Sequence, residues 1–253
     1  MFEGARVAVV VPAFNEERLI GRTLGRVPSY VDQVIVVDDG SLDDTAAHAR
    51  GTGDPRVTVI SHDVNRGVGA AIASGYREAF LGGADVAVVM AGDAQMDAAD
   101  LPALLTPVVR GDADYAKGDR LSYPHAFTQM PLARFFGNHV LSALTRVATG
   151  LPVRDSQCGY TALSRHAEQH IATDAVWPRY GYPNDMLGRA AAAGVRVRDV
   201  TVRPVYGDES SGIGLRHAIF VVPFVLARVV ARRAGALFAA DPHAMPPIAR
   251  DEG

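Results

Sequence analysis

The 253-residue sequence is poor in cysteine and has no strong excess of either charge. Its one cysteine, Cys158, excludes an internal disulfide framework and a cysteine-rich zinc site, and it fits a reducing cytoplasm. The formal net charge of −3 gives no basic field of the kind that neutralises nucleic-acid phosphates. We therefore expect no nucleic-acid partner.

Long apolar segments are also missing. A short polar start, residues 1–6, runs directly into a strand-like segment, so we expect no secretion signal. Residues 218–227 form an apolar stretch that is interrupted by Pro223 and followed by arginines, whereas a membrane-spanning helix needs about 20 apolar residues. This segment either lies in a membrane interface or packs under the domain as a core helix, and the sequence leaves both alternatives open.

The first half of the chain alternates short apolar runs with helical patterns. The apolar runs predict buried strands at residues 7–11, 34–37, 57–60 and 86–90. The segments between them predict helices at residues 16–26, 44–50 and 68–81. Such alternation predicts an α/β, Rossmann-like fold with a mostly parallel central sheet flanked by helices.

The second half is less regular. It predicts helices at residues 101–110, 132–149 and about 185–193, and extended segments at residues 115–118, 153–163 and 195–202. We expect one domain over residues 1–211, an apolar and basic helical segment over 212–240, and a disordered tail over 241–253.

Polar residues follow the first two predicted strands, at the edge of the sheet where this fold binds ligands. The run Asp38-Asp39-Gly40-Ser41 follows the second strand, and the segment 12–17 follows the first. Two adjacent acids beside a glycine suit contacts to a base or to ribose hydroxyls. Turn formation and helix capping explain the same residue types equally simply.

The fourth predicted strand ends in an acidic loop that contains Asp93, Gln95 and Asp97. A hard divalent cation prefers oxygen ligands, and it can bridge a diphosphate and stabilise the charge that develops on it. The loop therefore predicts a site for Mg²⁺ or Mn²⁺. Simple capping of the next helix accounts for Asp100 but not for these three side chains.

Six motifs, in order, resemble those of family 2 glycosyltransferases, and specifically the polyprenyl-phosphate (dolichol-phosphate mannose synthase-like) sugar synthases. They span roughly residues 6 to 210 and read VPAFNEE, VVDDGS, NRGVGAAIASGY, VVMAGDAQMD, KGDR and DSQCGYTALSR. The resemblance implies a GT-A glycosyltransferase fold. It also implies a nucleotide site made by Pro12, Phe14, Asn15, Glu16, Asp38, Asp39, Gly40, Ser41, Asn65 and Gly67.

The resemblance also implies roles for the remaining polar residues. Asp93 and Gln95, with Asp97, would bind the metal and the diphosphate. The family often has an acid where this sequence has Ala91, so either Asp97 compensates or the diphosphate itself holds more of the metal.

On the acceptor side, Arg120 and Arg134 would meet a phosphate, which a guanidinium matches bidentately. Asp155 and Gln157 would lie close to the sugar. Asp185 would either reach the sugar pocket or cap its helix.

These assignments predict transfer of a sugar, with inversion, from a UDP- or GDP-sugar to a polyprenyl phosphate. The alternatives are transfer to a sugar hydroxyl, for which Asp155 or Asp185 must act as a base, and a degenerate nucleotide-sugar-binding protein. Because the chain has no spanning helices of its own, we expect a cytoplasmic protein, peripheral at the inner face of the cell membrane. It would contact the membrane surface or a small multi-span membrane partner.

Overall fold

The computed structural model describes residues 1–206 and 221–239, with no side-chain detail from residue 234 onward. The predicted segment boundary at residue 212 and the predicted disordered tail lie outside the described residues. Within them, a seven-stranded sheet has the order β3-β2-β1-β4-β6-β5-β7. The strands are β1 (Val7–Ala13), β2 (Gln33–Asp38), β3 (Val57–Ser61), β4 (Val86–Val89), β5 (Tyr115–Asp119), β6 (Thr161–Ser164) and β7 (Val197–Thr201).

Most strand pairs are parallel, as predicted. β1 pairs in parallel with β2 and β4, β2 with β3, and β5 with β7. The exception is β6, which runs antiparallel to both β4 and β5. The extended segment expected at residues 153–163 is wrong in extent, because only its end forms this strand and the residues before it form a loop.

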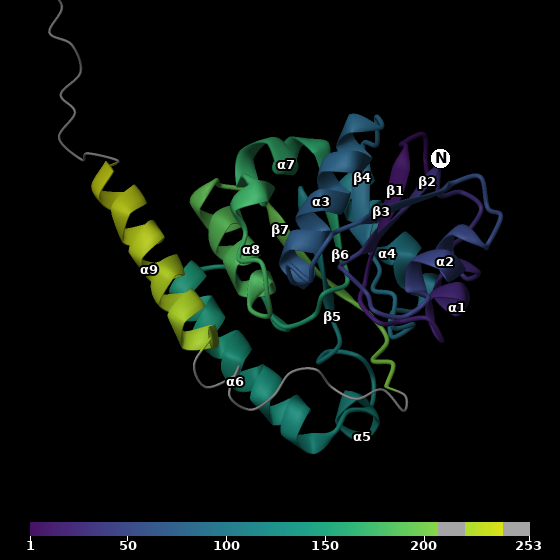
Figure 1. The fold of residues 1–253 in the computed structure, drawn as a ribbon. Helices are drawn as coiled ribbons and strands as arrows, with labels where there is room; N and C mark the ends of the chain where they lie inside the picture. The colour runs from purple at the N-terminus through teal and green to yellow at the C-terminus, as the bar shows by residue number, and fades with distance from the viewer. Residues whose placement is uncertain (207–220, 240–253) are drawn as a thin grey trace, which may run out of the picture.

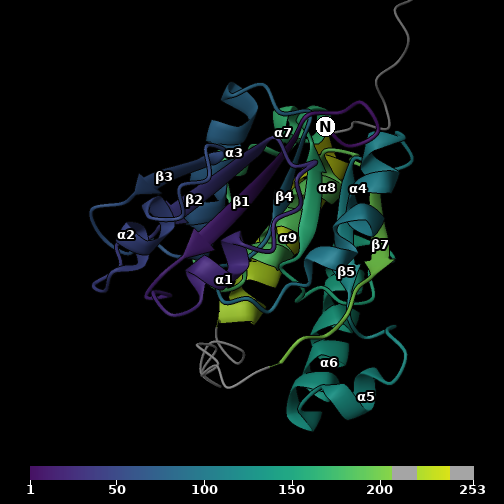
Figure 2. The ribbon, with the colours of Figure 1, turned by 90° about the vertical axis from the view of Figure 1, so that its right-hand side faces the viewer.

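Helices cover both faces of the sheet (Figures 1 and 2). One face packs against α1 (Ile20–Leu24), α2 (Thr45–Arg50) and α4 (Leu101–Val109). The other packs against α3 (Val68–Leu81), α7 (Arg165–Ile171) and α8 (Tyr182–Ala192). The helix predicted at residues 16–26 is shorter than expected, since its first residues form the turn that follows β1.

Helix α3 lies unusually close to the sheet. A Cβ atom added at Gly75 would overlap the side chain of Val10 on β1, so only glycine allows this approach. The helix begins after Gly67, whose φ of 101° is in the left-handed region. Close packing therefore holds the start of α3 beside the end of β1, which is where the candidate site lies.

Three further helices of the described residues lie beside the sheet and the helices that cover it. The short α5 (Ala126–Gln129) leads into α6 (Leu132–Thr149), which packs against α9 (Val222–Ala239). Val222, Leu226 and Val229 of α9 are buried there against Ala148 of α6. α9 also contacts α8, so the described part of the C-terminal segment packs on the domain.

No helix among residues 1–206 and 221–239 is both long enough and apolar enough to span a membrane.

Candidate active site

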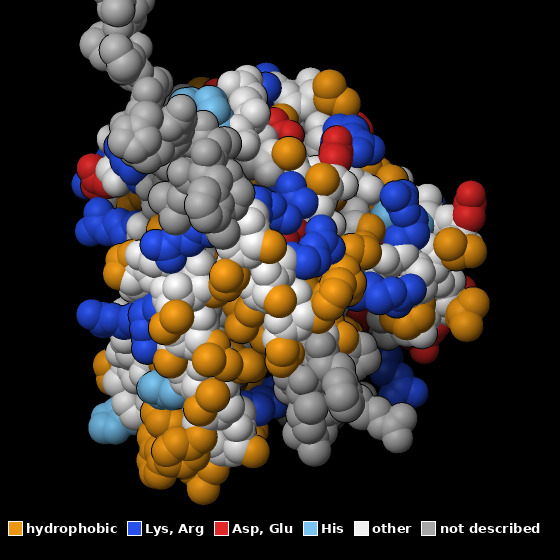
Figure 3. All heavy atoms as spheres, turned by 90° about the vertical axis from the view of Figure 1, so that its left-hand side faces the viewer, with side chains coloured by type: hydrophobic (Ala, Val, Ile, Leu, Met, Phe, Trp, Pro, Cys, Tyr) orange, Lys and Arg blue, Asp and Glu red, His pale blue; other side chains and the backbone are white. Residues whose placement is uncertain are grey.

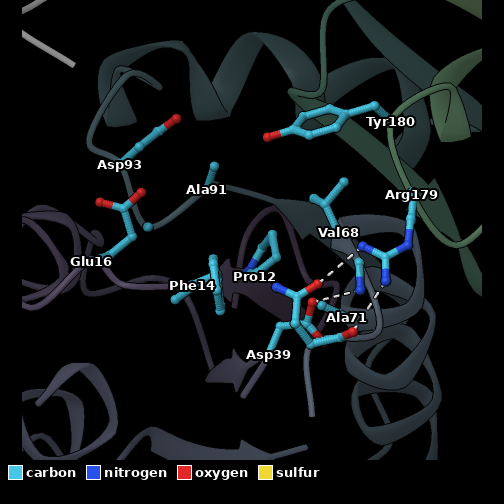
Figure 4. A pocket seen from close by; sticks show the side chains of 14 residues that line it. Pro12, Phe14, Glu16, Asp39, Val68, Ala71, Ala91, Asp93, Arg179 and Tyr180 are labelled. Carbon is cyan, nitrogen blue, oxygen red and sulfur yellow. Dashed lines mark hydrogen bonds between the residues drawn. The ribbon is translucent and has the colours of Figure 1, made fainter. Parts of the chain in front are cut away.

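A pocket of about 490 Å³ opens at the carboxyl ends of β1 and β4, beside the start of α3. Seven residues that the sequence assigned to the site line it (Figure 4). They are Pro12, Phe14, Glu16, Asp39, Asn65, Gly67 and Asp93. The pocket thus brings Asp39 and Asp93, from the ends of two different strands, into one cleft.

Asp39 is buried, and three donors hold its carboxylate. Its Oδ1 accepts hydrogen bonds from the Nδ1 of His62 at 2.7 Å and the backbone N–H of Arg66 at 3.0 Å. Its Oδ2 accepts one from the backbone N–H of Gly67 at 2.7 Å. The Nε2 of His62 lies 3.0 Å from the hydroxyl of Ser74. This frame fixes the carboxylate while leaving Oδ2 with room for a further donor.

The loops after β1 and β2 are joined into one unit. The backbone N–H of Asn15 donates to the hydroxyl of Ser41 at 2.9 Å, and the side-chain oxygen of Asn15 accepts from the backbone N–H of Leu42 at 2.9 Å. Asn15 has a φ of 56°, a conformation that asparagine tolerates better than most residues. Asp38 accepts from the backbone N–H of Ser41 at 3.1 Å. These residues therefore shape the loops behind the pocket.

Gly40 belongs to the same loop unit. Its φ is 72°, and an added Cβ would lie 2.6 Å from the backbone carbon of Val64. The turn that follows β2 can form only with glycine at this position. Gly40 thus lets the chain pass close to the segment that carries Asn65 and Gly67.

Asp93 and Glu16 present their carboxylates at the same end of the pocket, with the methyl group of Ala91 beside them (Figure 4). The Oδ1 of Asp93 accepts from the backbone N–H of Gln95 at 3.0 Å. Within the described residues, no group of three or more acidic, histidine or cysteine side chains forms a metal cluster. Two carboxylates nonetheless fit a hard cation whose other ligands are diphosphate oxygens.

Asp97 has other partners. It caps the turn Ala98–Asp100, accepting from the backbone N–H of Ala99 at 3.0 Å, and pairs with Arg203 at 2.9 Å. It lines a second, separate pocket rather than the one that contains Asp93. We therefore do not include Asp97 in the proposed metal site.

Arg120 and Asp155 form a buried ion pair beyond β5. The Nε of Arg120 donates to Asp155 Oδ2 at 2.8 Å, and a second guanidinium nitrogen lies 3.2 Å from Oδ1. Burial raises the pKa of Asp155, but the adjacent Arg120 outweighs this effect, so the net pKa lies below the usual value. Lys117, also fully buried, donates to the carbonyl of Cys158, and burial lowers its pKa.

Gln157 belongs to a buried polar network. Its side-chain amide donates to Asn184 of α8 at 3.0 Å and to the hydroxyl of Ser156 at 2.8 Å. Asn184 in turn donates to Thr145 of α6 at 2.6 Å. The loop that carries Asp155 and Gln157 is thus fastened to two helices.

Asp185 is held away from the pocket. Its carboxylate accepts hydrogen bonds from Arg189 of α8 at 2.9 Å, from Arg232 of α9 at 3.2 Å and from the backbone N–H of Trp177 at 3.0 Å. Burial raises the pKa of Asp185, but the two arginines lower its net value. Of the two positions expected for Asp185, the structure shows neither a helix cap nor a place in the lining of this pocket, and it gives the residue a tethering position.

Sequence reasoning missed Arg179 and Tyr180, which also line the pocket. They lie in the segment just after Trp177, and Pro178 of that segment accepts hydrogen bonds from the first N–H groups of α3 at 2.8 and 3.1 Å. The guanidinium of Arg179 donates to the side-chain oxygen and the backbone carbonyl of Asn65, both at 3.4 Å. The sequence signal for a pocket-lining segment here was an arginine and two tyrosines in a stretch without apolar periodicity.

Comparison with known proteins matches residues 8–172 to the family described as Glycosyl transferase family 2. A UDP-N-acetylglucosamine–dolichyl-phosphate N-acetylglucosaminyltransferase from Methanococcus voltae is 29% identical over 223 residues, covering 82% of this chain and 89% of the relative. An undecaprenyl-phosphate mannosyltransferase from Micrococcus luteus is 33% identical over 202 residues, covering 78% and 82%.

Among solved structures, the fold is similar to that of glucosyl-3-phosphoglycerate synthase from Mycobacterium tuberculosis in complex with Mn²⁺, UDP-glucose and phosphoglyceric acid. The TM-score is 0.66 at 21% sequence identity, over 92% of this chain and 80% of that chain. At this identity the similarity concerns the fold, which is the GT-A fold. The chain belongs to glycosyl transferase family 2 and is a glycosyltransferase.

Proposed function

We propose that this enzyme transfers a sugar, with inversion, from a nucleotide-diphosphate sugar to a polyprenyl phosphate. The observation that carries the proposal is the single pocket lined by both Asp39 and Asp93. Asp39 offers an oriented acceptor for the nucleotide, and Asp93 offers negative charge where a cation would meet the diphosphate. Relatives named for transfer to dolichyl or undecaprenyl phosphate support the choice of acceptor.

The charges near the site favour a phosphate acceptor over a sugar hydroxyl. A hydroxyl needs a base that titrates near neutral pH, but Asp155 and Asp185 are both ion-paired and have lowered pKa values. A phosphate oxygen is already anionic and needs no base. The guanidinium of Arg120 uses Nε and one terminal nitrogen to hold Asp155, and its remaining N–H groups can orient such an anion.

Catalysis then rests on alignment and electrostatics. The framed carboxylate of Asp39 holds the donor in one position, which supplies part of the rate through proximity. Mg²⁺ or Mn²⁺, held by Asp93 with Glu16 nearby, would supply positive charge to the leaving diphosphate. The backbone N–H of Gln95 donates a hydrogen bond that orients the carboxylate of Asp93. A single displacement at the anomeric carbon gives inversion.

Location follows from the acceptor. A polyprenyl phosphate is anchored in a bilayer, while nucleotide sugars are dissolved in the cytoplasm. We therefore place the enzyme peripherally at the cytoplasmic face of the cell membrane.

The test is a transfer assay with Mg²⁺ or Mn²⁺, a water-soluble short-chain polyprenyl phosphate and a panel of UDP- and GDP-sugars. Product is identified by mass. We expect a glycolipid from one donor and its loss in Asp93→Asn. Asp97→Asn is the matched control, since it lies in the same loop but outside the pocket, and it should keep most of its turnover. Equal activity of the two variants would contradict the assignment of Asp93.

A further inference from the structure

Helix α6 has polar residues on its buried side and large apolar residues on its exposed side, which is the reverse of an ordinary surface helix. Its buried side carries polar residues: Ser142 and Thr145 both reach the hydroxyl of Ser156, at 3.3 and 3.2 Å. Its exposed side carries large apolar residues, continued by Phe127 of α5. The exposed apolar side chains on the two helices are Phe127, Leu132, Phe136, Val140, Leu144 and Val147, here called the α5–α6 apolar face.

This face is a continuous stripe. Leu132, Phe136, Val140 and Leu144 follow one another at intervals of four residues, which places them along one side of the helix. Near the N-terminal end of α6, the rings of Phe127, Phe135 and Phe136 form a cluster of edge-on contacts. Figures 1 and 2 show α5 and the adjoining end of α6 projecting beyond the sheet. In Figure 3, hydrophobic side chains gather at the foot of the molecule. Such an exposed patch marks an interaction surface.

The charges around this face select its partner. Residues 120–154, which include both helices, contain four arginines and no aspartate or glutamate. Arg120 is paired with Asp155, which leaves Arg134, Arg146 and Arg154 as the positive charges of this segment. Two copies of the chain joined through this face would bring like charges together, which opposes self-association. An anionic lipid surface satisfies both features, because apolar side chains enter the acyl boundary while arginines stay among the headgroups.

The segment also starts and ends at the candidate acceptor site. Arg120 precedes it and Asp155 follows it, and these two residues pair with each other at 2.8 Å. Because Ser156 anchors the inner side of α6, the apolar face has a fixed position relative to that ion pair. A bilayer bound through this face would therefore lie at a fixed position relative to Arg120.

We infer that the α5–α6 apolar face docks the enzyme on anionic lipid bilayers. The inference rests on the proposed function for its purpose, since a membrane-embedded phosphate acceptor requires such contact. The sequence left open whether residues 218–227 lie in a membrane interface or pack on the domain. Val222 and Leu226 of that stretch are buried against α6, so we assign the membrane contact to the α5–α6 apolar face.

The test is flotation of the full chain with vesicles of phosphatidylglycerol and phosphatidylcholine, compared with phosphatidylcholine alone. The wild-type chain should float with the anionic vesicles and less with the neutral ones, and added salt should weaken binding. The double variant Phe136→Ser/Val140→Ser should bind at least about tenfold more weakly, because it removes two large apolar side chains from the face.

The matched control is Leu81→Ser, which removes an even more exposed apolar side chain at the end of α3, on another part of the surface. It should float like the wild type. Circular dichroism and thermal melting establish that all three chains are folded. Unchanged flotation of the double variant, no flotation of the wild type, or a dimer that the double variant abolishes would each overturn the inference.

Transfer to the water-soluble short-chain acceptor separates this inference from the proposed function. The double variant should keep wild-type turnover there, since neither residue lies in the pocket. Turnover without vesicle binding would refute only the docking face. Vesicle binding without transfer from any donor would refute only the proposed reaction.

Discussion

Replacing Asp185 by asparagine tests whether this buried carboxylate joins α9 to the donor pocket. The substitution keeps the shape of the side chain but leaves Arg189 and Arg232 without their counter-ion. Removing one partner of a buried pair costs about 3–5 kcal/mol. The side chains of Arg189 and Arg232 are 12% and 28% exposed and can regain part of their hydration. We therefore expect the lower end, about 3 kcal/mol.

Thermal unfolding provides the assay. For a protein of this size each kcal/mol lowers Tm by about 2–4 °C, so Asp185→Asn should melt about 6–12 °C below the wild type at neutral pH. The matched control is Asp174→Asn, which breaks the exposed pair between Arg77 and Asp174, whose side chains are 57% and 63% exposed. Such surface pairs contribute about 1 kcal/mol at most. A Tm of Asp185→Asn as high as that of the control would refute the argument.

The pH dependence gives a second readout. Because the folded-state pKa of Asp185 is lowered, its stabilisation is fully present above the unfolded-state pKa of about 3.9 and is lost as the pH falls through the folded value. The Tm difference should thus stay constant from neutral pH to about pH 5 and shrink below about pH 4. The donor KM should rise as well, because Trp177, bound to Asp185, leads directly into Arg179 and Tyr180 of the pocket.

Three further substitutions follow from the geometry. Gly67→Ala should lower the free energy of unfolding by about 1–3 kcal/mol, because φ is 101° and the new Cβ would overlap the Pro178 carbonyl. Thermal unfolding measures this loss, and Gly53→Ala, with open space around the new Cβ, should cost less. His62→Ala should raise the donor KM by about tenfold with a smaller effect on kcat, because Asp39 loses one of its three hydrogen-bond donors. An unchanged donor KM would contradict the role of His62 in positioning Asp39. Arg120→Lys should lower kcat/KM for the acceptor by at least about tenfold and leave the donor KM unaltered, because lysine cannot hold Asp155 through two nitrogens and also donate to a phosphate. Steady-state kinetics with each substrate varied would detect the opposite pattern.

The elements that the sequence predicted best are those whose pattern is local. Helix α3 at residues 68–81 and α6 at residues 132–149 have the predicted ends, because a glycine with positive φ precedes one and follows the other. Strands β1 and β2 were long apolar runs buried on both faces. The antiparallel β6 was not predictable in this way, since its direction depends on pairing with β4 and β5, which are distant in sequence.

In the candidate site, too, some features could be predicted from the local sequence and others depend on residues distant in sequence. Motif order predicted that Asp39 and Asp93 approach each other, because both follow strands of one sheet. Motif spacing did not predict that Asp97 turns away, which depends on the left-handed backbone at Ala94 and on the distant partner Arg203. His62 was missed for a similar reason, since its bond to Asp39 forms only when β2 and β3 lie side by side.

The layer formed by α6 and α9 connects the surface of the molecule to both halves of the site. Through Thr145 and Ser142, α6 holds the loop that contains Asp155, on the proposed acceptor side. Through Arg232 and Asp185, α9 holds the segment that brings Arg179 and Tyr180 to the donor pocket. The two helices pack on each other. A bilayer that binds α6 would therefore contact a layer that is fastened to both parts of the site.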